Sequence, residues 1–207
     1  MPDNIKMYFP GLSELQKEQF SKLEEIYRIW NSKINVISRK DIDNFFIHHL
    51  IHSLSVAKII NFRHSTTILD AGTGGGFPGI PLAIMFPECS FTLIDSIGKK
   101  ISVVSAVALE IGLSNVIPVK RRIENESGKY DFIVSRAVTS FPSFVELTSK
   151  NVAKNSLNDL QNGILYLKGG DLTGELGRYK KMARIWNISG FFDHPFFETK
   201  KIIHLPL

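Results

Sequence analysis

A cluster of glycines is the feature of the 207-residue sequence that most clearly suggests chemistry, with five glycines in the eight positions from Gly72 to Gly79. They follow the short apolar run Thr67–Leu69 and precede an apolar stretch with helical spacing. Glycine allows positive φ angles and close approach to the main chain, and the start of a helix offers free N–H donors. The cluster therefore predicts a loop against which a nucleoside-bearing ligand lies, at the carboxyl edge of a parallel sheet.

Two classes of ligand compete for this loop. Gly74-x-Gly76-x-x-Gly79 matches the dinucleotide fingerprint, and Asp95 follows Gly74 by 21 residues, as a ribose-binding acid should. In the other frame, Asp70-x-Gly72-x-Gly74-x-Gly76 places an acid at the strand end before alternating glycines, which is typical of methyltransferases that use S-adenosylmethionine. That donor has no phosphate but carries a sulfonium and an amino group, which a carboxylate at Asp70 suits. We favour the methyl donor, contacted by Gly72, Gly74 and Gly76, and a nicotinamide-dependent oxidoreductase is the rival interpretation.

Two further segments are expected to complete the ligand site. Asp95 ends the apolar run Phe91–Ile94, where a carboxylate can accept hydrogen bonds from both ribose hydroxyls, although it could also cap the helical stretch that follows. After the third apolar run comes Arg122-Ile123-Glu124. This loop is expected beside the adenine, with Ile123 packing on the ring.

The fourth apolar run exits through Ser135 and Arg136 and lacks two familiar catalytic signatures. It has no Asn/Asp-Pro-Pro-Tyr/Phe motif for amine methylation, and Cys89, the single cysteine, is not placed to attack a pyrimidine C5. The target atom therefore needs neither a covalent intermediate nor a base, as holds for guanine N7, and positioning matters most. Arg136 could hold the donor's carboxylate or guanine O6, or be a surface residue in a salt bridge. Lys168, at the end of the fifth run, could hold a phosphate or the base.

The elements that must position these residues change in character along the chain. Residues 12 to about 62 read as helical, with a capping box at Ser13 and Gln16 and with Asp43 as the expected cap of a second helix. His48, His49 and His52 lie within one turn of that helix, but no carboxylate or cysteine completes a metal-ligand set, so no metal is expected.

From residue 63 onward, short apolar runs alternate with helical stretches, which predicts an α/β domain with a doubly wound, mostly parallel sheet. The division is therefore a helical extension over 1–62 and a Rossmann-like domain over 63–207. The expected strands contain Thr67–Leu69, Phe91–Ile94, Val116–Val119, Phe132–Val134 and Ile164–Leu167, and the expected helices are Ile80–Phe86, Lys99–Ile111 and Ser143–Lys154. Phe196–Leu205 could add an antiparallel strand.

Composition excludes several classes of protein. Apolar residues make up 43% and charged residues 22%, and no apolar run reaches the length of a membrane span, so neither a disordered nor a membrane-spanning chain is expected. One cysteine allows no internal disulfide. We expect a cytoplasmic monomer. The net charge of +5 is modest, but six basic and two acidic residues lie in 178–207, which suits a polyanion such as RNA. The candidate RNA contacts are Lys99, Lys100, Arg136, Lys168, Arg178, Lys180 and Lys181.

Several collinear motifs resemble the glucose-inhibited division protein B family. They are Trp30-Asn31-x-x-Ile34-Asn35, His49-Leu50-x-x-Ser53, the stretch from Asp70 to Leu82 with its two prolines, Leu93-Ile94-Asp95-Ser96-x-Gly98-Lys99-Lys100, Ser135-Arg136-Ala137 and Leu167-Lys168-Gly169. The resemblance implies a class I methyltransferase that uses S-adenosylmethionine to modify guanine N7 in small-subunit ribosomal RNA. It also implies donor contacts at Gly72, Phe77, Ile123, Glu124 and Arg136. The chain departs from the family at His52, where an acid is usual, at Gly75, where alanine or proline is usual, and after Arg184.

The sequence thus predicts N7-methylation of a specific guanine in small-subunit (16S) ribosomal RNA, acting on the RNA or on the ribosomal subunit without an obligate protein partner. The alternative is an RNA-binding ribosome assembly factor that keeps the fold without transfer activity.

Overall fold

The computed structural model contains one seven-stranded sheet with the strand order β3-β2-β1-β4-β5-β7-β6. The structure describes residues 2–136, 138–170, 172 and 174–207, so Ala137 of the motif after the fourth run lies outside the described residues. Strands β1 (Thr67–Ala71), β2 (Ser90–Asp95), β3 (Val116–Lys120), β4 (Phe132–Arg136) and β5 (Gly163–Gly169) are parallel neighbours. Their carboxyl ends meet at one edge, and the predicted α/β architecture is confirmed.

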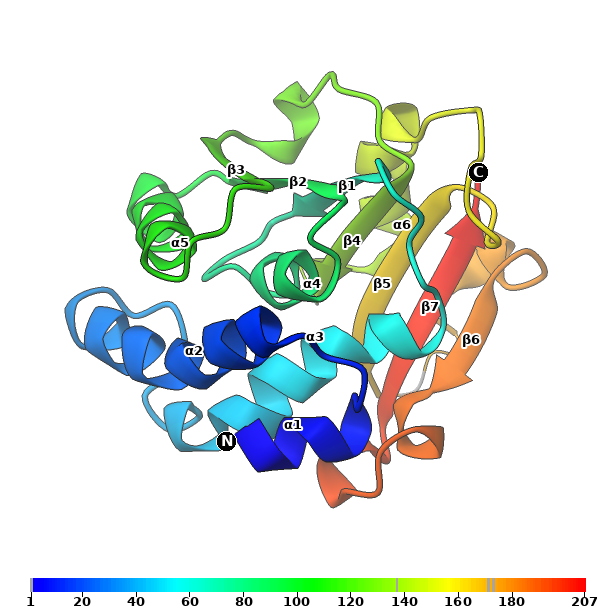
Figure 1. Ribbon diagram of the computed structural model, residues 1–207. Helices are drawn as coiled ribbons and strands as arrows, with labels where there is room; N and C mark the ends of the chain where they lie inside the picture. Colours follow the sequence, from blue (N-terminus) through cyan, green and yellow to red (C-terminus); the bar gives the residue numbers. More distant parts are fainter. Residues whose placement is uncertain (1, 137, 171, 173) are drawn as a thin grey trace.

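Helices cover both faces of this sheet (Figure 1). One face packs against α4 (Gly79–Met85), α5 (Gly98–Glu110) and the N-terminal helices α1 (Pro2–Tyr8) and α2 (Glu14–Lys33). The other face packs against α6 (Phe141–Thr148). Alternation along each strand separates the two cores: Ile68 faces the first and Leu69 the second. Arg136, which follows Val134 by two residues in β4, therefore points to the face of the N-terminal helices.

The N-terminal helices begin as predicted and then differ. Ser13 and Gln16 form a capping box, with the Gln16 N–H donating to Ser13 Oγ and the Ser13 N–H donating to Gln16 Oε1. Asp43 is not a helix cap: it lies in the 3-10 turn Ile42–Asn44, and its carboxylate accepts a 2.9 Å bond from Arg28. The next segment, Phe45–Ile51, is a π-helix that continues into α3 (His52–Leu54). Residues before and after the predicted boundary at 62 share one core, and the division itself stays a prediction.

The C-terminal strands differ from the expectation in extent. An antiparallel strand is confirmed as β7 (Lys200–Pro206), which pairs with β5, whereas Pro195–Phe197 forms a 3-10 turn because proline disfavours the ladder. The sequence did not predict β6 (Arg184–Asn187), a four-residue edge strand beside β7. The helix expected over Ser143–Lys154 begins at Phe141, capped by Ser140, and ends at Thr148.

Candidate functional site

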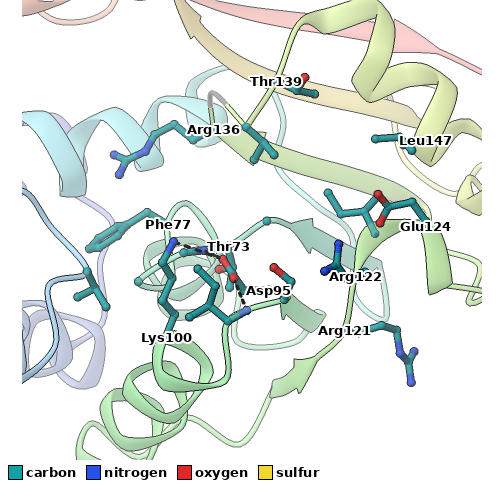
Figure 2. A pocket seen from close by; sticks show the side chains of 18 residues that line it. Thr73, Phe77, Asp95, Lys100, Arg121, Arg122, Glu124, Arg136, Thr139 and Leu147 are labelled. Carbon is teal, nitrogen blue, oxygen red and sulfur yellow. Dashed lines mark hydrogen bonds and ion pairs between the residues drawn. The ribbon is translucent and has the colours of Figure 1, made fainter.

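A cavity of about 540 Å³ opens at the carboxyl edge of the sheet, where β1, β2, β3 and β4 end. It is elongated: Figure 2 shows Phe77 and Arg136 at one end, Asp95 in the middle, and Glu124 and Leu147 at the other end. We call it the donor cavity. The predicted residues that line it are Gly72, Gly74, Phe77, Asp95, Lys100, Ile123, Glu124 and Arg136. The predicted residues outside the described lining are Gly76, Lys99, Lys168, Arg178, Lys180 and Lys181.

The glycine loop follows β1 and bends through left-handed backbone conformations. Gly72 has φ +74°, and a Cβ there would lie 2.6 Å from Val138 across the mouth of the cavity. Gly76 has φ +102°, and a Cβ there would lie 2.7 Å from Ile80 and 2.9 Å from the Tyr27 hydroxyl. Gly72 is therefore required by a close approach at the cavity, whereas Gly76 is required by packing beneath the loop.

Helix α2 supports the loop from below through a residue that the sequence analysis missed. The buried Tyr27 hydroxyl donates a 2.6 Å hydrogen bond to the Gly75 carbonyl, and its ring packs on Phe77 at 4.8 Å. Burial raises the pKa of Tyr27, so the hydroxyl stays a donor. The only sequence signal was that Tyr27 lies four residues after the core residue Leu23 in an amphipathic helix, which does not distinguish support of a loop from ordinary packing.

Asp70 ties the loop together and does not line the donor cavity. Its Oδ2 accepts bonds from Thr73 Oγ1 at 2.6 Å and from the Gly79 N–H at 2.8 Å, which joins β1 to the start of α4. Burial raises the pKa of Asp70 to about 7, and the two hydrogen bonds oppose that shift only in part. The expectation that this carboxylate faces a bound sulfonium is therefore replaced by a structural role.

Asp95 lines the donor cavity at the end of β2 and is held by two backbone N–H groups. Its Oδ1 accepts a 2.8 Å bond from the Ile97 N–H before α5, and its Oδ2 accepts a 3.1 Å bond from the Gly74 N–H. Each carboxylate oxygen has a second lone pair, and the side chain lines the cavity. The carboxylate is therefore held in a fixed orientation with capacity left for a ligand.

The donor cavity fits S-adenosylmethionine by the chemistry of its lining. The Asp95 carboxylate can accept from vicinal ribose hydroxyls, and the apolar Ile123 and Leu147 offer surfaces for an adenine ring at the same end. At the other end, a Cβ on Gly74 would meet no atom within 4 Å, so the loop leaves open space there. The Gly74 N–H is taken by the Asp95 carboxylate, whereas a dinucleotide site would offer such loop N–H groups to a pyrophosphate.

Arg136 is held by the helical segment that covers it. Its Nη1 donates to the His48 carbonyl at 3.0 Å and its Nη2 to His49 Nδ1 at 2.9 Å, and the guanidinium lies 5.2 Å from the Phe77 ring centroid. Burial lowers the pKa of Arg136 to about 10, so it remains a cation at neutral pH. These contacts, and not the surface salt bridge considered from the sequence, hold the Arg136 side chain.

The contact with Arg136 fixes the tautomer of His49. A guanidinium only donates, so His49 Nδ1 accepts, and the ring proton lies on Nε2, which donates to Asp41 Oδ2 at 2.7 Å. Burial, helped by the charge of Arg136, lowers the pKa of His49 to about 4, so the ring is neutral. Burial alone would raise the pKa of Asp41, but bonds from His48 and His49 outweigh it and lower the pKa.

The remaining predicted residues lie outside the donor cavity, and Lys168 lines a smaller cavity that also includes Arg136. The Lys168 ammonium pairs with Glu175, and Arg178 pairs with Glu146 at 3.2 Å. Lys180 and Lys181 lie just after the 3-10 turn Gly177–Tyr179. Within the described residues, no group of three or more His, Cys, Asp or Glu side chains is placed to hold a metal ion, and no helix is long and apolar enough to cross a bilayer.

Known proteins resemble this chain over most of its length. The family model described as GidB, rRNA small subunit methyltransferase G, matches residues 16–190. The ribosomal RNA small subunit methyltransferase G of Flavobacterium psychrophilum is 57% identical over 205 residues, which cover 99% of this chain and 98% of that protein. The protein of the same name from Christiangramia forsetii is 53% identical over 98% of this chain and 96% of its own length.

A solved structure supports the fold alone. The crystal structure of a SAM-dependent methyltransferase from Aquifex aeolicus matches with a TM-score of 0.51 and 15% identity, over 73% of this chain and 87% of that chain. Together, the family model over most of the chain and the relatives above half identity over nearly its whole length show that this chain belongs to the GidB family, the rRNA small subunit methyltransferases G.

Proposed function

We propose that this chain transfers the methyl group of S-adenosylmethionine to N7 of a guanine in small-subunit (16S) ribosomal RNA. The observation that carries the proposal is the donor cavity, in which a glycine loop and the oriented Asp95 carboxylate lie beside the exit of β4, together with membership of the GidB family. The substrate is the ribosomal RNA or the ribosomal subunit, in the cytoplasm, and the enzyme acts as a monomer.

Different residues of the donor cavity contact different parts of S-adenosylmethionine. Asp95 accepts from the ribose hydroxyls, while Ile123 and Glu124 border the adenine. Gly72, Gly74 and Phe77 border the methionine end, and Gly76 shapes the loop from outside the cavity lining. Asp95 and the Gly74 N–H are already hydrogen-bonded, so donor binding does not require the loop to reorganise first.

The target atom determines what the protein has to supply. When bound, S-adenosylmethionine supplies an electrophilic methyl group, and guanine N7 carries a lone pair and no proton. No general base is therefore required at the exit of β4, where Ser135 and Arg136 lie. The contribution of this chain is to orient the base and exclude water. Arg136, a cation held at the end of the donor cavity, is the candidate donor to guanine O6.

Incubation with methyl-labelled S-adenosylmethionine and either small-subunit ribosomal RNA or isolated subunits tests the proposal. After digestion to nucleosides, the label is expected in 7-methylguanosine. Label in an exocyclic amine or in a ribose would contradict the assignment of the target atom. RNA binding with neither donor binding nor transfer would favour the assembly-factor interpretation instead.

A further inference from the structure

A second, smaller cavity of about 240 Å³ lies beside the donor cavity and shares Arg136 with it. We call it the side cavity. It lies between the helical segment Phe45–Ile51 with its extension at His52 and the edge of the sheet where β5 ends and β7 begins. The Asp, Glu, Lys and Arg residues that line it are Asp41, Arg136, Lys168 and Lys200, and His49, Gly169 and Phe196 also belong to the lining. Lys168 is paired with Glu175, which leaves the Arg136 and Lys200 cations and the Asp41 carboxylate.

Arg136 is a cation without a carboxylate partner among the described residues. Its N–H groups donate to the His48 carbonyl and to the neutral ring of His49, and the guanidinium lies over the Phe77 ring. The carboxylate nearest along this chain of contacts, Asp41, already accepts from His48 at 2.6 Å and from His49 at 2.7 Å. Burial lowers the pKa of the guanidinium to about 10, and the nearby charges of Asp70 and Asp41 oppose that shift only in part. A largely buried cation of this kind favours a bound anion.

Lys200 supplies a second cation on the same face of the sheet. Arg136 pairs with Leu167 in the β4–β5 register, Leu167 pairs with Ile202, and Gly169 pairs with Lys200, so Arg136, Gly169 and Lys200 point to one side. The Lys200 Nζ lies 4.8 Å from the Phe196 ring centroid. A Cβ on Gly169 would come within 2.8 Å of that Nζ, so a glycine at this position leaves enough space for the Lys200 ammonium. Among the ion pairs of the described residues, none includes Lys200.

We infer that the side cavity binds a phosphodiester group of the substrate RNA through the Arg136 guanidinium and the Lys200 ammonium. The inference rests on the proposed function and deepens it, because it assigns a binding site to the RNA backbone in addition to the site for the target base. The carboxylate of the methyl donor is the other anion that could bind to these two cations. The position of Lys200 argues against it, because Lys200 lies on β7, three strands from the glycine loop after β1, and does not line the donor cavity. Two cations, set against the Asp41 carboxylate of the lining, suit the single charge of a phosphodiester.

Lys200→Gln tests the inference, with Lys201→Gln as the matched control. Lys201 is the next residue of β7, points to the opposite face and donates to the Gly170 carbonyl at 3.2 Å, so its substitution removes the same charge from the other side of the sheet. We expect Lys200→Gln to weaken binding of small-subunit ribosomal RNA about tenfold at fixed salt. We also expect it to reduce the slope of log affinity against log salt by about 0.7 to 0.9, the value for one lost phosphate contact. Lys200→Arg should restore both quantities.

The affinity for S-adenosylmethionine, measured by calorimetry on the same variants, separates the two oxyanions. It should be unchanged in Lys200→Gln, and a selective loss of donor affinity would overturn the assignment to RNA. Equal effects of Lys200→Gln and Lys201→Gln on RNA binding would also overturn it. The RNA-binding assay does not depend on methyl transfer. If the wild-type protein made no 7-methylguanosine, the proposed function would be contradicted, but the comparison of Lys200→Gln with Lys201→Gln would still test the phosphodiester site.

Discussion

Arg136 Nη2 donates a 2.9 Å hydrogen bond to His49 Nδ1, which joins the exit of β4 to the helical segment that covers it. The contact holds the guanidinium where the donor cavity and the side cavity meet. His49 is in turn held by Asp41 through Nε2. A chain of three side chains, from a loop, a π-helix and a strand, therefore orients the one cation that both cavities share.

Substitution of His49 tests this positioning role. His49→Leu removes the acceptor and leaves a buried guanidinium N–H unpaired, at a cost of about 1–3 kcal/mol, so we expect kcat/KM for RNA to fall about tenfold or more. His49→Asn places an amide oxygen close to the position of Nδ1 and should retain more activity. A purely structural role for His49 predicts instead that both variants lose thermal stability while their folded fractions keep wild-type kcat and KM.

Substitution of Asp95 tests the donor site. Asp95→Ala removes the acceptor for the ribose hydroxyls and also releases the N–H groups of Gly74 and Ile97, so we expect the Kd for S-adenosylmethionine to rise about 100-fold. Calorimetry measures this directly. Asp159→Asn is the control, since it removes an exposed acid that pairs with Arg63 outside the donor cavity. Unchanged donor affinity in Asp95→Ala would refute the assignment.

Tyr27→Phe tests whether helix α2 shapes the glycine loop. Loss of the hydroxyl leaves the Gly75 carbonyl without its 2.6 Å partner, so the free energy of unfolding should fall by about 1–3 kcal/mol. Donor affinity should weaken as well, because the loop loses its support. Tyr8→Phe in α1, outside the donor cavity, is the control for removal of a tyrosine hydroxyl. A variant with reduced stability but wild-type donor affinity would show that the loop holds its shape without Tyr27.

Asp70 predicts a pH dependence of stability with a definite sign. Burial raises its pKa to about 7 in the folded protein, against about 3.9 in an unfolded chain. The folded state therefore binds more protons between these values, and the stabilisation from Asp70 is full below about pH 3.9 and is lost as the pH rises through 7. Asp70→Asn does not titrate, so its stability relative to wild type should improve from pH 5 to pH 8 in urea unfolding. A constant difference between the two proteins over that range would contradict the raised pKa.

The sequence was sufficient for the elements whose signals are local. The glycine cluster, the acid that ends β2 and the alternation of apolar runs with helical stretches predicted β1 to β5 along the chain, their parallel pairing and the edge at which the site lies. The capping box at Ser13 was also predicted, because both of its partners lie within one turn. The family resemblance, carried by motifs from residue 28 to 170, is confirmed by the family model.

Contacts between distant segments could not be read from the sequence. Asp43 matched the pattern of a helix cap, but its carboxylate accepts a hydrogen bond from Arg28, fifteen residues away in α2. Asp41, which the sequence did not single out, accepts from two histidine side chains. Lys168 and Lys200 look equally basic in the sequence. Only the register of β5 with β7 shows that Lys200 shares a face with Arg136, while Lys168 pairs with Glu175.

Mass-spectrometric mapping of small-subunit ribosomal RNA is the most direct test of the proposed function. RNA from cells that lack this protein is compared with RNA from the same cells carrying either the wild-type chain or Asp95→Ala. One guanine is expected to lose its N7-methyl group in the deletion and to regain it only with the wild-type chain. A methylation pattern unchanged by the deletion, or a lost methyl group at any atom other than a guanine N7, would contradict the proposal.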